Sequence, residues 1–290
     1  MATIVHPKDF LHLLHCSCPA HAPLVWTEYG KVVCQSCNKV FSVTENILEL
    51  VDISLLDAET TRELKGNTYT LSDESIRKMA NKDSWSDYYS HLQKGNFIPL
   101  SRYLDRVHCS QIFALAAGTG YEIKCLSAMQ QLDTVFCSDL SYSALYITLF
   151  TLQSIDIKVG LFTSNVDDCP IENKEIPILI YEGLHHTCDM HVAIEQLLIN
   201  GYKHIFFVEP ADNFLIKWLA RKGLAQRVEY SGVKPGRLDL KKLYSLCKVH
   251  GYKSSVTTTW HFPEDYFRKF CRSSGLVQTD LRHFGDESRS

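Results

Sequence analysis

The sequence has little of what membrane, fibrous or strongly basic proteins require. Its longest apolar runs, such as 176–181 and 205–208, are the length of strands, far short of the ~20 residues of a membrane-spanning helix. The formal net charge of -3 over 290 residues excludes a strongly basic nucleic-acid-binding protein. The first 18 residues lack the unbroken apolar core of a signal peptide. We therefore expect a folded cytoplasmic protein, with 45% hydrophobic residues available for its core.

The cysteines do not form a disulfide framework. There are 11 of them, and most stand singly among apolar neighbours, as buried thiols do. The exceptions are Cys18-x-x-His21 and Cys34-x-x-Cys37, with twelve residues between the two pairs. Two such pairs can hold one tetrahedral zinc ion. We predict a structural zinc site of Cys18, His21, Cys34 and Cys37, with Cys16 as the alternative to His21 in an all-cysteine site.

The pattern of the chain divides it into three parts. Residues 1–52 are organised around cysteine and histidine and cannot build much of a core without a metal. Residues 53–108 have helix-like spacing, with Pro99 near the start of one helix, and form a helical connector or cap. From 109 to 290, strand-sized apolar runs alternate with helical segments, which predicts a doubly wound, mostly parallel sheet with a late antiparallel strand. The expected strands are 112–115, 134–138, 158–162, 176–181, 204–209, 252–261 and 276–283.

A turn of small residues follows the first of these strands. It reads Ala116-Ala117-Gly118-Thr119-Gly120 and leads into a helix, so that a ligand can approach the backbone and the helix N-terminus. Asp139 stands at the tip of the next strand, where an acidic side chain can accept hydrogen bonds from two ribose hydroxyls. Together they indicate a nucleoside-bearing cofactor. A dinucleotide is disfavoured, because Ile123 stands where its third glycine would be.

These residues resemble the class I S-adenosylmethionine-dependent methyltransferases, whose domain is Rossmann-like with seven strands. The resemblance covers about residues 110–290 and places Ala116, Gly118 and Gly120 at the three glycine positions of the cofactor turn. The segment 164–171 looks like the family's segment after the third strand, with Asn165 at the position that meets the adenine. The resemblance also assigns Leu140, Val166 and Glu182, beside these turns, to the cofactor.

Two further segments resemble this family. Leu184-His185-His186 looks like the histidine pair that follows the fourth strand in small-molecule members, and Glu209-Pro210 looks like the turn after the fifth. A histidine titrates near neutrality and can remove a proton from an acceptor, so His186 and His185 are the candidate catalytic residues. His186 is preferred because it lies further from the strand, nearer the mouth of the crevice. The N-terminal part resembles the short zinc ribbon found at the front of some methyltransferases.

The sequence therefore predicts a methyltransferase with S-adenosylmethionine as cofactor and a structural zinc ion. The acceptor is expected to be a small molecule, which could be anionic. An RNA methyltransferase is the alternative, because ten Lys or Arg residues lie between 217 and 253 against two acids. A non-catalytic binding or scaffold protein is a second alternative, because Ala114 and Ala116 depart from the acidic residue and first glycine of the family's turn.

Overall fold

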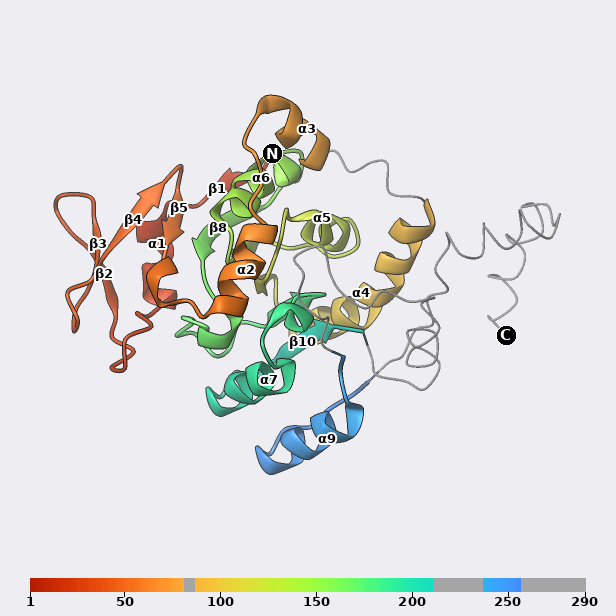
Figure 1. The fold of residues 1–290 in the computed structure, drawn as a ribbon. Coiled ribbons are helices and arrows are strands. Elements are labelled where there is room, and N and C mark those ends of the chain that lie inside the picture. Colours follow the sequence, from red (N-terminus) through yellow and green to blue (C-terminus); the bar gives the residue numbers. More distant parts are fainter. Residues whose placement is uncertain (81–86, 211–236, 257–290) are drawn as a thin grey trace, which may run out of the picture.

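Figure 1 shows the computed structural model of the chain, which describes residues 1–80, 87–210 and 237–256, with the backbone alone at 87–94. The strands are β1 (Thr3–Ile4), β2 (Leu24–Trp26), β3 (Val32–Cys34), β4 (Val40–Thr44), β5 (Ile47–Glu49), β6 (Gln111–Leu115), β7 (Thr134–Asp139), β8 (Lys158–Thr163), β9 (Ile178–Tyr181) and β10 (Ile205–Val208). The α-helices are α1 (Pro7–Phe10), α2 (Ala58–Gly66), α3 (Asp73–Ala80), α4 (Asp87–Val107), α5 (Tyr121–Ser127), α6 (Tyr142–Leu152), α7 (Met190–Ile199) and α9 (Leu240–Val249). Short 3₁₀ helices are η1 (Leu11–Leu13), η2 (Ile53–Leu55), η3 (Val166–Asp168) and η4 (Leu184–His186).

Five parallel strands form the centre of the sheet, in the order β10-β9-β6-β7-β8. The first of these strands along the chain, β6, lies in the middle, and the chain moves outward from it in both directions. In such a sheet the order reverses beside β6, and ligands bind in the crevice outside the carboxyl ends of the strands at that point. The predicted α/β, Rossmann-like fold is thus confirmed.

Both faces of this sheet are covered, as the continuous apolar runs of its strands require. Successive residues of β6 point to opposite sides: Ile112 belongs to a buried apolar cluster with residues of α4, α5 and α6, whereas Phe113 belongs to one with residues of α1, α7 and α9. Polar side chains set the helix starts. Asp57, Asp189 and Asp239 each accept hydrogen bonds from the first backbone N–H groups of α2, α7 and α9.

The N-terminal module continues the central sheet. Strands β2 to β5 form antiparallel pairs in sequence, and β5 then pairs in parallel with β8. β1 pairs with β8 as well. The module forms the left edge of the molecule in Figure 1. The sheet therefore has ten strands instead of the expected seven, because the module adds its strands to β8.

Some expectations fall at or beyond the described residues. The expected strand 276–283 lies outside them, as do residues 257–261 of the strand 252–261, and the described part, 252–256, contains no strand. Pro99 lies inside α4 instead of near its start. Within the described residues, no helix combines the length and apolar character needed to span a bilayer.

The end of β5 is fastened to the end of β8 by one side chain. The buried Thr163 hydroxyl accepts hydrogen bonds from the backbone N–H groups of Leu50 (2.9 Å) and Val51 (3.1 Å). The next residues along the chain, from Ser164, enter the crevice beyond β8. The N-terminal module and the connector that follows it are thus attached directly beside the crevice.

Candidate functional site

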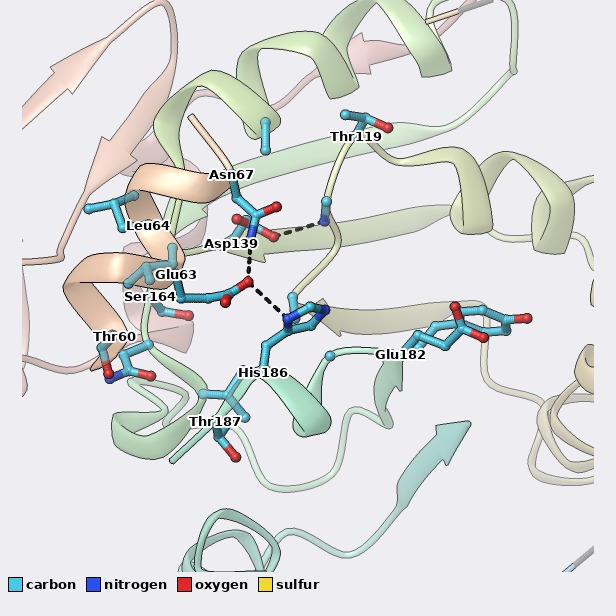
Figure 2. Close-up of a pocket in the computed structure, with 18 of the residues that line it drawn as sticks. Thr60, Glu63, Leu64, Asn67, Thr119, Asp139, Ser164, Glu182, His186 and Thr187 are labelled. Atoms are coloured by element: carbon cyan, nitrogen blue, oxygen red, sulfur yellow. Dashed lines mark hydrogen bonds and ion pairs between the residues drawn. The ribbon is translucent and has the colours of Figure 1, made fainter. Parts of the chain in front are cut away.

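A cavity of about 240 Å³ opens at the carboxyl ends of the central strands. Its lining comes from the turns after β6, β7, β8 and β9, and from helix α2 on the opposite side. Figure 2 shows Glu63 and Leu64 of α2 near Asp139 at the end of β7, with the Glu63 side chain reaching toward His186. The connector thus supplies one wall of the crevice.

The turn after β6 is bent so that its backbone faces the cavity. Gly118 has a φ of +54°, and a Cβ added there would meet no atom within 4 Å. Its N–H donates to Asp139 Oδ2 over 2.9 Å. Ala116 lines the cavity with a φ of +51°, although it carries a Cβ. The open space beside Gly118 is what a bound ligand close to the backbone needs.

Gly120 has a different role in the same turn. It begins helix α5 with a φ of +77°, and an added Cβ would lie 2.7 Å from Thr148 Cγ2. Thr148 is fully buried in α6. Gly120 therefore allows α5 and α6 to pack closely, and it does not line the cavity.

Alanine substitutions at the two glycines should separate these roles. Gly118→Ala is expected to cost about 1 kcal/mol of stability, from the left-handed φ alone. Gly120→Ala should cost about 2 to 4 kcal/mol, since the new methyl group also collides with buried Thr148. Urea denaturation of both variants measures the difference. Equal losses in the two variants would contradict these separate roles of the glycines.

Asp139 lies at the end of β7 with both carboxylate oxygens facing backbone donors. Oδ2 accepts from the Gly118 N–H and Oδ1 from the Ser141 N–H, each over 2.9 Å. Burial raises the pKa of Asp139, and these two hydrogen bonds oppose the increase. Ser141, and not Asp139, caps helix α6. Each carboxylate oxygen keeps a further lone pair that can accept from a ligand hydroxyl.

The other residues assigned to the cofactor lie around the same space. Asn165, Val166, Leu140 and Glu182 all line the cavity. The Asn165 side chain accepts from the Asp167 N–H and so fixes the turn into η3. Burial raises the pKa of Glu182. Of the expected cofactor residues, the structure brings all to the cavity except Gly120.

The two adjacent histidines face different surroundings. His186 lines the cavity, and its Nδ1 lies 2.9 Å from Glu63 Oε1 of α2. His185 is buried, does not line the cavity, and places its Nδ1 2.8 Å from Glu209 Oε2. Their rings are in contact, with centroids 4.1 Å apart.

Glu209 organises the backbone after β9. Its Oε1 accepts from the N–H groups of Gly183 (2.8 Å) and Leu184 (2.7 Å), while Oε2 meets His185. The side chain has no exposed surface. These contacts hold the loop that carries His186.

Carboxylates are the main charged groups of the cavity lining. Glu63, Glu122, Asp139, Asp167 and Glu182 all contribute, and no Lys or Arg is among the described lining residues. Burial, with Asp57 and Asp189 nearby, raises the pKa of Asp167 to about 6. Such a lining favours positively charged or neutral ligands over anions.

The sequence predicts residues 53–108, which include α2, as a connector or cap, but it does not single out Glu63. A buried glutamate within a helix gives no local signal, because its partner lies more than a hundred residues further along the chain. Only the fold brings the two together.

The N-terminal module assembles four cysteines. The sulfur atoms of Cys16, Cys18, Cys34 and Cys37 all lie within 4.8 Å of one another, with Cys16–Cys37 and Cys18–Cys34 separations of 3.8 Å. Sulfur atoms at about 2.3 Å from a tetrahedral zinc ion are about 3.8 Å apart, so the donor set fits this metal. The assembled set contains Cys16 and not His21.

The local backbone explains both the fit and the exclusion of His21. Burial alone would raise the pKa of the Cys34 thiol, but N–H groups of Cys37 and Ser36 donate to its sulfur, and the pKa falls to about 6. His21 instead turns its Nδ1 toward His15 Nδ1, 3.4 Å away. The predicted ligand set was based on the spacing of residues along the chain. The fold brings Cys16 to the site in place of His21.

Metal analysis should separate the two ligand sets. We expect about one zinc ion per chain, lost in Cys16→Ser and retained in His21→Ala, because four thiolates complete the tetrahedron. Cys109→Ser is the control, since it removes a thiol outside the module. Loss of zinc in His21→Ala together with retention in Cys16→Ser would instead support the set of three cysteines and one histidine.

The whole sequence matches no family model and no curated protein. Solved structures are similar in fold. Magnesium protoporphyrin IX methyltransferase from Synechocystis PCC 6803, with bound SAH, is 10% identical with a TM-score of 0.49, covering 70% of this chain and 95% of that one. The YcgJ protein from Bacillus subtilis is 12% identical with a TM-score of 0.46, covering 67% and 81%. A protein from Bacillus halodurans C-125, described as a candidate methyltransferase, is 13% identical with a TM-score of 0.40, covering 49% and 62%.

These likenesses concern the fold alone. The order of the parallel strands, the small-residue turn after β6 and the acidic residue at the end of β7 are observed in the chain itself. The chain has the Rossmann-like fold that the sequence resemblance to class I methyltransferases implies.

Proposed function

We propose that the chain is an S-adenosylmethionine-dependent methyltransferase that acts on a small-molecule acceptor. The observation that carries this proposal is the cavity at the carboxyl ends of the strands, where Asp139 faces the open backbone at Gly118. An acidic side chain opposite a small-residue turn suits a ribose with two free hydroxyls. The cofactor would supply a methyl group bound to a positively charged sulfur, which suits the carboxylate-rich lining.

Each wall of the cavity has a part in this proposal. Asp139 would accept hydrogen bonds from the ribose hydroxyls, and Gly118 leaves room for the cofactor chain. Asn165 and Val166, on the turn into η3, would contact the adenine, as the sequence resemblance implies. Helix α2 would cover the reacting groups and limit their contact with water.

His186 is the proposed base. It lines the cavity, and its imidazole can take a proton from an acceptor oxygen or nitrogen when that atom attacks the methyl carbon. Alignment of the acceptor in the cavity would supply the rest of the rate increase. His185, held by Glu209, would only position the loop.

A small acceptor is favoured over RNA by the charge of the cavity. No Lys or Arg is among the described lining residues, whereas phosphate recognition depends on such side chains. An anionic acceptor is disfavoured for the same reason. Residues 217–236 of the basic stretch lie outside the described part of the chain, and Lys241, Lys242 and Lys248 lie on α9.

Zinc is proposed to have a structural role. All four positions of a tetrahedral site would be filled by protein sulfur, which leaves no place for a reacting ligand.

Methyl transfer can be measured before the acceptor is identified. The full chain is incubated with S-adenosylmethionine labelled in its methyl group, and with either a filtered extract of small metabolites or purified RNA. We expect label in compounds of low mass. Label in RNA alone would overturn the acceptor class, and binding of SAH without transfer to either fraction would support the non-catalytic alternative.

A further inference from the structure

One carboxylate of the cavity lining, that of Glu63, lies beside the proposed base His186. Glu63 of α2 is 5% exposed, and its Oε1 lies 2.9 Å from Nδ1 of His186. The same oxygen accepts a hydrogen bond from Nδ2 of Asn67, the residue directly after α2. Figure 2 shows both contacts as dashed lines, with the Glu63 carboxylate reaching from α2 toward the His186 ring.

The position of Glu63 is fixed from several directions. Asp57 caps α2 by accepting from the N–H groups of Glu59 and Thr60, and the Cys188 thiol also donates to Asp57 over 3.7 Å. The helix is thus attached to the segment that follows η4. On the other side, the His186 ring rests against His185. A carboxylate held in this way restricts the orientation of the imidazole.

We infer that Glu63 is the positioning residue of His186: the charge of its carboxylate, which is within ion-pair distance of Nδ1 but outside hydrogen-bond geometry with it, favours the proton on Nδ1, so that Nε2 is left as the proton acceptor. A neutral imidazole carries one proton, and a carboxylate beside one ring nitrogen selects the tautomer protonated there. The carboxylate also stabilises the imidazolium that forms when Nε2 takes a proton.

The inference rests on the proposed function and narrows its acceptor class. A base contributes when the nucleophile carries a proton that it holds at neutral pH, as a hydroxyl or an ammonium group does. With the cofactor bound, the acceptor oxygen or nitrogen would bond to the methyl carbon as the methyl–sulfur bond breaks. The acceptor proton would pass to Nε2, during this step for a hydroxyl and before it for an ammonium group, which has no lone pair until it loses the proton. Together with the carboxylate-rich lining, this points to an uncharged or cationic acceptor with a hydroxyl or amine.

Other charged groups also face His186. Asp139 and Glu182 both interact electrostatically with it, from the ends of β7 and β9, and His185 contacts its ring. These groups remain in place when Glu63 is changed. The effect of Glu63 can therefore be isolated by substitution at that position alone.

Titration of His186 by NMR tests the inference without an acceptor. The full chain is labelled with ¹⁵N-histidine, and the His186 signal is assigned from its loss in His186→Gln. In the unmodified protein we expect the tautomer protonated at Nδ1. Glu63→Gln, which keeps an acceptor oxygen but removes the charge, should lower the pKa of His186 by about one unit. Glu63→Ala should lower it similarly and mix the tautomers.

Controls separate positioning from folding. Glu59→Gln makes the same change on α2 away from the cavity and should leave the titration of His186 unchanged, and Glu63→Asp should retain part of the effect. An unchanged pKa and tautomer in both Glu63→Gln and Glu63→Ala would overturn the inference. Calorimetry with SAH tests the proposed function separately: failure of the unmodified chain to bind SAH would contradict that function. The NMR titration tests only the role of Glu63.

Discussion

Replacing His186 by alanine is expected to lower the turnover of methyl transfer by ~10² to 10⁴, the usual contribution of a general base. The affinity for SAH should remain nearly unchanged, because proton removal concerns the acceptor. Initial rates with an acceptor identified by the labelling experiment, and calorimetry with SAH, give the two quantities. The unmodified enzyme should also lose activity at low pH as His186 becomes protonated, and the variant should lack that dependence.

His185→Ala provides the comparison. His185 is paired with buried Glu209, which also holds the Gly183 and Leu184 N–H groups, so its loss should reduce stability more than it reduces the chemical step. A full loss of turnover in His185→Ala, with His186→Ala unaffected, would transfer the role of base to His185. Full activity in both variants would leave alignment alone as the source of catalysis.

Asp139→Ala should weaken SAH binding by about 1.5 to 3 kcal/mol, the usual value of hydrogen bonds to a charged group. This corresponds to about a 10- to 150-fold increase in Kd. We expect a loss of affinity because Asp139 ends β7 beside the open backbone of Gly118, where the ribose would bind. Calorimetry at neutral pH measures the change.

The substitution also removes the acceptor of the Gly118 and Ser141 N–H groups, so folding must be checked by thermal denaturation. Asp133→Ala, just before β7 and outside the cavity lining, makes the same chemical change and should leave the affinity unchanged. An Asp139→Ala protein that is folded and binds SAH as well as the unmodified chain would remove Asp139 from the cofactor site.

The central sheet could be predicted because its strands are visible in the local sequence as short apolar runs. Runs such as Ile112–Leu115 are apolar on both faces and end in a small-residue turn, which is typical of a buried parallel strand before a ligand crevice. The positions of Gly118 and Asp139 beside the cavity follow from that order of strands.

Contacts between distant segments could not be predicted in the same way. The pattern did not show that β5 would pair with β8, since a short strand such as Ile47–Glu49 fits many edges. Spacing alone favoured His21 over Cys16, although the folded module turns His21 toward His15. The contact of Glu63 with His186 depends on how α2 lies against the sheet, which a helical pattern does not specify.

The central claim is that the cavity between Asp139, Gly118 and helix α2 holds S-adenosylmethionine. The most direct measurement is a crystal structure of the full chain grown with saturating SAH. We predict SAH in this cavity, with its ribose hydroxyls on Asp139 and its sulfur on the side of His186. An empty cavity under these conditions, or SAH bound elsewhere on the chain, would contradict the claim.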